Sequence, residues 1–246
     1  LGSGTESVMA ALRIARIATG KKRIIKIGLP AGIQSAVFAV ANIIIQSAIN
    51  SLGTEVMAAS SAAMSLEYVC YNLLNSFSQA CTTFVGQNYG AGQLERCKKT
   101  MFLCLGEGFA FLAVGVVLIL YFGKPLLSIF DSNPQVIEVG YIRLMLLMLS
   151  HVFSLCYEVL AGYLRGFGIS LPPAVLTMLG VCGVRLTWIY LVFPKSRTFQ
   201  TIMAAFPISL AFTTLLILVA VLCYHPARRF ASMENTPLAK ETEANA

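Results

Sequence analysis

Long stretches without charge alternate with short polar joints along this chain. No Asp, Glu, Lys or Arg occurs between Lys26 and Glu55, or between Arg197 and Arg228. A helix that crosses a membrane needs about 20 predominantly apolar residues. The pattern predicts an all-α polytopic membrane protein whose six transmembrane helices lie at about 24–51, 54–86, 98–122, 136–164, 170–193 and 199–224. Residues 1–23 and 226–246 are expected to be a cytoplasmic linker and a cytoplasmic tail around a lobe that spans 24–225.

Composition narrows the function classes. Hydrophobic residues make up 57% of the 246 residues and charged residues only 12%, whereas soluble domains carry about 25% charged residues. So little polar surface cannot coat a globule in water, which argues against a soluble enzyme, a disordered regulator and a nucleic-acid-binding protein. The sequence contains no GxSxG, HExxH or P-loop motif, so neither enzymatic activity nor an organic cofactor is expected.

The positive charge is distributed unevenly, and this predicts an orientation. The net charge is +7, and thirteen of the Lys and Arg residues lie near the two ends of the chain and in the joints after the second and fourth spans. Four are assigned to the opposite side: Lys124, Arg143, Lys195 and Arg197. Because cytoplasmic joints carry the excess of Lys and Arg, both ends are predicted to be cytoplasmic. The basic segments are expected to contact lipid headgroups and not nucleic acid.

In three of the predicted spans the polar side chains share one helical face, since successive residues turn by about 100°. The three faces carry Ser35, Asn42, Gln46 and Asn50; Ser60, Glu67, Tyr71, Asn75 and Ser78; and His151, Ser154, Glu158, Gly162 and Arg165. Three such faces predict a common water-filled interior. The other interpretation is that the amides and hydroxyls only hydrogen-bond between helices, for about 0.6–2 kcal/mol each.

Two carboxylates within these faces are the strongest functional candidates. A charge at mid-membrane costs at least about 2.5–3.5 kcal/mol, so Glu67 and Glu158 are predicted to have a functional role. His151 is compatible with either a packed, hydrogen-bonded residue or a proton relay. Arg185, in the fifth span, is expected to pair with a carboxylate, and Glu67 is the nearest one in estimated depth.

Four short motifs resemble those of one transporter family. They are Gly28-Leu-Pro-Ala-Gly32, Thr83-Phe-Val-Gly-Gln-Asn-Tyr-Gly-Ala-Gly92, Leu164-Arg-Gly-Phe-Gly-Ile-Ser170 and Gly180-Val-Cys-Gly-Val-Arg185. With these motifs the chain resembles the multidrug and toxic compound extrusion (MATE) transporters from about residue 20 to 225. The motif residues carried over as structural are Gly86, Gln87, Asn88, Gly90, Arg165, Gly166 and Arg185.

The resemblance implies a fold of two six-helix lobes, of which this chain is similar to the second. The partner of the chain would then be the N-terminal six-helix lobe, in the same polypeptide or as a second copy. Family members export small organic compounds, often cations, across the bacterial inner membrane by alternating access. The export is driven by inward movement of Na⁺ or H⁺, so that the coupling ion is the only cofactor implied.

The resemblance also implies roles for particular residues. Cation coupling and substrate contact are expected at Glu158, Glu67, His151 and Ser154, and the cavity is expected to be lined by Gln34, Asn42, Gln46, Tyr71 and Asn75. Where many Na⁺-driven members have a carboxylate in the seventh helix, this chain has Phe38, and Ser154 stands where some have Asp. Glu158 fits the Glu-x-x-x-Gly-x-Leu-Arg-Gly variant of related bacterial branches. The resemblance thus allows a Na⁺ site without identifying its ligands.

Two other functions fit parts of the pattern. A flippase for lipid-linked sugars, from the same superfamily, favours a cavity lined with Arg and Lys, and only Arg165 and Arg185 are expected there. A membrane assembly protein does not need polar faces on three helices, and no re-entrant filter segment indicates a six-helix channel. The sequence therefore favours the C-terminal half of a cation-coupled efflux transporter. Phe38, Tyr68 and Tyr71 suit an organic cation through cation–π contacts.

Overall fold

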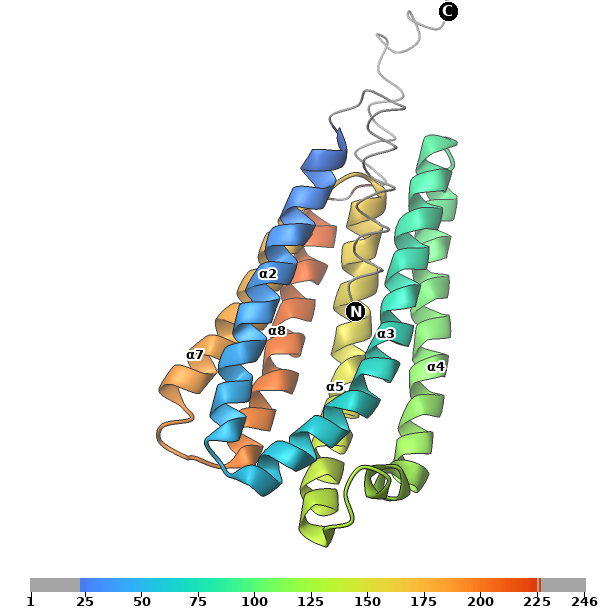
Figure 1. The fold of residues 1–246 in the computed structure, drawn as a ribbon. Coiled ribbons are helices and arrows are strands. Elements are labelled where there is room, and N and C mark those ends of the chain that lie inside the picture. Colours follow the sequence, from blue (N-terminus) through green and yellow to red (C-terminus); the bar gives the residue numbers. More distant parts are fainter. Residues whose placement is uncertain (1–22, 225, 227–246) are drawn as a thin grey trace, which may run out of the picture.

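The computed structural model describes residues 23–224 and 226 as a bundle of long helices. These are α2 (Arg23–Asn50), α3 (Thr54–Gly90), α4 (Leu94–Ser128), α5 (Pro134–Gly166), a fifth helical segment built from α6 (Leu171–Thr177), the π-helix η1 (Met178–Gly183) and α7 (Val184–Leu191), and α8 (Phe199–Tyr224). Successive helices run in opposite directions (Figure 1). The all-α prediction is confirmed. The predicted linker and tail lie outside the described residues, apart from Arg23 and Pro226.

Local sequence explains where several helices begin and end. Asn133 caps α5, its Oδ1 accepting a hydrogen bond from the Gln135 amide at 2.9 Å, and Pro134 fills the first helical position, where its missing N–H costs nothing. The prolines 172 and 173 lie in the first turn of α6. The predicted third span, 98–122, lies inside α4, which continues through Pro125 to Ser128. Apolar composition marks the hydrocarbon segment, but the helix extends beyond it.

Five of the six helical segments are long and apolar enough to cross a membrane. The exception is α3, which has 37 residues but carries two glutamates and a row of hydroxyl and amide side chains. It packs along α4 and α5, and it runs beside them in the bundle (Figure 1). The presence of six helices agrees with the prediction, while a membrane crossing by α3 stays a prediction.

The most extensive helix contact joins α3 to α5, and it includes a close approach at a glycine. A Cβ atom on Gly162 would lie 2.6 Å from the Ser78 carbonyl oxygen. The backbones are cross-linked at the same place, because the Ser78 hydroxyl donates to the Glu158 carbonyl at 2.7 Å and the Thr82 hydroxyl donates to the Gly162 carbonyl at 3.1 Å. Small residues and interhelical hydrogen bonds are the usual means by which helices associate in membranes.

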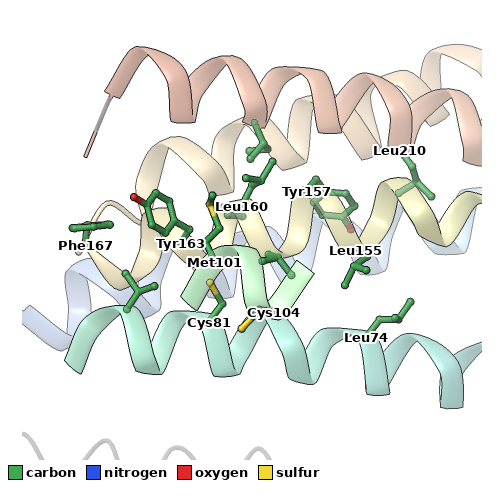
Figure 2. Packing of buried hydrophobic residues seen from close by; sticks show 14 of the residues in the cluster. Leu74, Cys81, Met101, Cys104, Leu155, Tyr157, Leu160, Tyr163, Phe167 and Leu210 are labelled. Carbon is green, nitrogen blue, oxygen red and sulfur yellow. The ribbon is translucent and has the colours of Figure 1, made fainter. Parts of the chain in front are cut away.

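Two of the three apolar clusters that include α5 residues lie on opposite sides of this helix. One fills the space between α3, α4 and α5 (Figure 2), with Leu74 and Cys81 from α3, Met101 and Cys104 from α4, and Leu155, Tyr157, Leu160 and Tyr163 from α5. The other joins α2 to α7, α8 and α5 through Ile45, Ile49, Ile189, Ile202 and Leu147. The helix α5 therefore forms the centre of the lobe, with α3 and α4 on one side and α2, α7 and α8 on the other (Figure 1).

Candidate functional site

The predicted polar faces of α2, α3 and α5 meet around a cavity of about 440 Å³. Its polar lining consists of Ser35, Asn42 and Gln46 from α2, Glu67, Tyr68 and Tyr71 from α3, Arg143, His151, Ser154 and Tyr157 from α5, and Arg185 from α7. The structure thus brings together six of the nine residues assigned to coupling or to the cavity. Phe206 and Leu210 complete one wall from α8.

Three of those nine residues do not border the cavity: Gln34, Asn75 and Glu158. Asn75 and Glu158 share the polar faces of their helices, but they lie at a different depth. There α3 and α5 are in direct contact through Ser78 and Gly162, which leaves no space between them. Helical periodicity predicts the direction in which a side chain points. It does not predict at which point along their axes two helices come into contact.

Glu67 is paired with Arg143, a buried arginine that the charge pattern had assigned to the side of the outer joints. The Arg143 Nη2 atom lies 3.1 Å from Glu67 Oε2, and its Nη1 donates to Ser60 Oγ at 2.6 Å. The side chain of Arg143 is 4% exposed, so it is not one of the outward-facing cations of the charge count. Its spacing did contain the signal, because Arg143, His151 and Ser154 lie on one face of an α-helix.

The expected pairing of Arg185 with a carboxylate is wrong. Its Nε donates to Ser209 Oγ at 3.0 Å, and its guanidinium carbon lies 4.2 Å from the centre of the Phe206 ring. The carboxylate of Glu67 is occupied by Arg143 instead. The π-helical turn of η1 directly precedes α7, and the sequence gives no sign of this irregular turn.

Glu158 belongs to a second, separate ion pair. The Arg165 Nη2 atom lies 3.4 Å from Glu158 Oε2, and the Tyr71 hydroxyl donates to Oε1 at 3.3 Å. The side chain of Glu158 is 12% exposed and that of Arg165 is 35% exposed. Because Tyr71 also lines the cavity, its hydroxyl connects the cavity wall to this second pair.

The motif glycines and amides lie mainly at helix ends. The chain leaves α3 and α5 through Gly92 and Gly168, whose φ angles are +71° and +79°, a conformation that glycine adopts without steric cost. A Cβ on Gly166 would lie 2.6 Å from Val85 Cγ1, whereas one on Gly90 would contact nothing. Asn88 Nδ2 donates to the Phe84 carbonyl within α3 at 2.8 Å. The motifs at 83–92 and 164–170 therefore shape the ends of α3 and α5. Of the seven motif residues carried over as structural, Arg185 lines the cavity and the other six do not.

The described residues contain no group of three or more His, Cys, Asp or Glu side chains arranged to hold a metal ion. The oxygen atoms that line the cavity come from Ser, Asn, Gln and Tyr side chains and from Glu67. Glu67 in the lining is paired with Arg143, and Glu158 outside it is paired with Arg165, while Arg185 lies on the Phe206 ring.

Long apolar helices packed around a charged cavity are the architecture of a multi-pass membrane protein. Residues 30–191 match the MatE family model. The chain therefore belongs to the MatE family, that of MATE/NorM-type multidrug efflux transporters, and is not an enzyme.

Sequence relatives agree with this assignment, and solved structures share the fold. The chain is 27% identical over 173 residues to the probable multidrug resistance protein NorM of Thermotoga maritima, covering 68% of this chain and 36% of that protein. It is 30% identical over 129 residues to the FAD transporter of Shewanella oneidensis, covering 52% of this chain and 28% of that protein. A crystal structure of MATE in the straight conformation has a TM-score of 0.74 at 17% identity, covering 82% of this chain and 45% of that structure. The chain thus spans about a third of the length of the curated relatives it matches.

Proposed function

We propose that the complete protein is a secondary active efflux transporter, which exports organic compounds by alternating access in exchange for inward-moving Na⁺ or H⁺. This chain forms its C-terminal six-helix lobe, and the N-terminal lobe is its partner. The single observation that carries the proposal is the charged cavity of about 440 Å³ between α2, α3 and α5. Ionisable groups at membrane depth mark substrate and ion pathways, and a central site between helices fits the general design of secondary transporters.

The orientation in the proposal follows from charge. The start of α2, the joints at 90–94 and 166–171 and the end of α8 lie at the same end of the bundle (Figure 1). Most Lys and Arg residues of the chain belong to these segments and to the flanking residues. Since the excess of Lys and Arg faces the cytoplasm, this end is cytoplasmic in the bacterial inner membrane.

We assign cation coupling to Glu158 in preference to Glu67. Glu67 is fixed by Arg143, which is itself bonded to Ser60 and almost fully buried. Glu158 has longer contacts, at 3.3 and 3.4 Å, to Tyr71 and to a partly exposed Arg165. A cation that binds Glu158 competes with Arg165 and with the Tyr71 hydroxyl. Because Tyr71 lines the cavity, this competition alters the substrate site whatever the charge of the substrate.

Replacement of Glu158 tests the coupling. In proteoliposomes that contain the complete transporter, Glu158→Gln is expected to lower efflux driven by a Na⁺ or H⁺ gradient by at least roughly tenfold, because loss of a positioned charge commonly costs that much. Substrate binding should persist. Glu138→Gln, which removes an exposed carboxylate paired with Lys124, is the matched control. Full gradient-driven efflux by Glu158→Gln would refute the assignment.

The aromatic lining supports an organic, amphipathic substrate. Phe38, Tyr68 and Tyr71 border the cavity, where flat rings can stack on a flat compound. A positive charge on the substrate stays a prediction, and the two cavity arginines weigh against it. The same arginines are the feature expected of a lipid-linked sugar flippase, since Arg143 joins Arg185 in the lining. A channel or assembly protein gains no comparable support.

A further inference from the structure

The cavity contains more buried positive charge than negative charge. Two guanidinium groups, those of Arg143 and Arg185, border it together with a single carboxylate, that of Glu67. Both arginines are buried, with 4% and 8% of their surface exposed. Glu67 is bonded to Arg143 at 3.1 Å, so Arg143 is compensated. The charge of Arg185 is therefore not matched by a carboxylate of its own among the described residues.

Arg185 is fixed by two contacts, and its two terminal nitrogens have no hydrogen-bond acceptor among the described side chains. Its Nε is bonded to Ser209 Oγ, and the Phe206 ring lies against it at 4.2 Å. Among the residues whose side chains the structure describes, no acceptor is bonded to its two terminal nitrogens. The same ring lies 5.9 Å from the guanidinium carbon of Arg143, so both arginines border one small region. A planar guanidinium fixed on a ring is well suited to bind phosphate or carboxylate with two hydrogen bonds.

His151, in the same cavity lining, is a second side chain whose hydrogen-bonding capacity is not satisfied. The side chain is 3% exposed, and neither Nδ1 nor Nε2 has a hydrogen-bond partner in the described part of the chain. Its ring lies 6.3 Å from that of Tyr71, centre to centre. A buried imidazole always has at least one N–H to donate, and an unmade buried hydrogen bond is costly. His151 and Arg185 line the same cavity, so an anionic group bound there has two kinds of donor in the lining.

We infer that this cavity binds an anionic group, a phosphate or carboxylate, carried by a compound with an aromatic part. Arg185 is the principal ligand, His151 the second donor, and Phe38, Tyr68 and Tyr71 contact the aromatic part. The inference rests on the proposed function, because it names the substrate class of the proposed efflux site. The anionic group belongs either to a soluble organic anion or to a lipid headgroup, which share this chemistry.

Two dyes with the same xanthene ring test the inference. Fluorescein is a dianion at neutral pH and rhodamine 123 is a cation, and their binding to the complete transporter in phosphatidylcholine nanodiscs is measured by fluorescence polarisation. Fluorescein is expected to bind at least about tenfold more tightly, and Arg185→Gln should weaken it by about tenfold. Arg185→Lys should restore part of the affinity, because it retains the charge. Lys124→Gln, which removes an exposed cation outside the cavity, should change nothing.

Tighter binding of rhodamine 123 by the unmodified transporter would overturn the inference without any variant. Unchanged fluorescein affinity in a monodisperse Arg185→Gln protein would also overturn it. Fluorescein binding that is lost in phosphatidylglycerol nanodiscs supports the anionic site and identifies its source as lipid, whereas retained binding supports a soluble anion. Gradient-driven export of rhodamine 123 that does not depend on Arg185 overturns the inference but leaves the proposed function intact. Arg185-dependent fluorescein binding without gradient-driven export of either dye supports the site and refutes the proposed function.

Discussion

Glu67→Ala is expected to lower the free energy of unfolding of the complete transporter by about 3–5 kcal/mol, because it leaves a buried arginine without its counter-charge. Arg143 is 4% exposed and makes its ion pair at 3.1 Å with Glu67. Its remaining partner is Ser60, a neutral hydroxyl. The loss is measured by denaturant unfolding in detergent, followed by far-UV circular dichroism.

Two variants provide the controls: one that also removes Arg143, and one that breaks an exposed ion pair. Glu67→Ala combined with Arg143→Met should be much closer to the unmodified protein, since an apolar side chain of similar length leaves no buried charge. Glu138→Ala breaks the ion pair with Lys124, whose side chains are 58% and 51% exposed. Solvent screens that pair, so the change should be about 0–1 kcal/mol. Equal losses for Glu67→Ala and Glu138→Ala would contradict the assigned role of the buried pair.

Gly162→Leu is expected to destabilise the lobe by about 3 kcal/mol, because overpacking at a rigid contact forces the backbones apart. Its Cβ would lie 2.6 Å from the Ser78 carbonyl oxygen and 3.0 Å from the Thr82 hydroxyl oxygen. Separation of α3 from α5 would also lengthen the bond from Ser78 to the Glu158 carbonyl. The same unfolding measurement reports the loss, and the yield of monodisperse protein should fall with it.

Gly106→Leu is the matched control for this substitution. Gly106 also lies inside a long helix, α4, but a Cβ there would contact nothing within 4 Å. The substitution is therefore expected to change the free energy of unfolding by less than about 0.5 kcal/mol. If both glycine variants behaved alike, the close approach of α3 and α5 at Gly162 would not be a determinant of stability.

Much of the fold follows from the sequence for simple physical reasons. Charge-free runs fix the number of helices, and proline and glycine fix several of their ends, as at Pro134 and Gly168. The polar helical faces place Asn42, Tyr71 and His151 in the lining of one cavity. These features are local or periodic, so a single sequence contains them.

The partners of the charged side chains were harder to predict, because they depend on how deep each residue lies in the bundle and on how each helix is rotated about its axis. Arg143 lies ten residues into α5, deep enough to be buried, yet its nearness to an outer joint suggested a surface cation. Arg185 follows a π-helical turn, so the position of its side chain departs from that of a regular helix. Long-range pairs such as Arg143 with Glu67, separated by 76 positions, cannot be read from spacing in one chain.

The fastening of α3 to α5 has a mechanical consequence. The Arg143–Glu67 pair joins these helices beside the cavity, and the bonds at Ser78 and Thr82 join them beyond it. The contact between α2 and α3 is far smaller than that between α3 and α5. The two cavity walls formed by α3 and α5 are thus held together as one rigid unit, and α2 is the wall that can move relative to it. A displacement of α2 relative to α3 then leaves the Arg143–Glu67 pair unbroken.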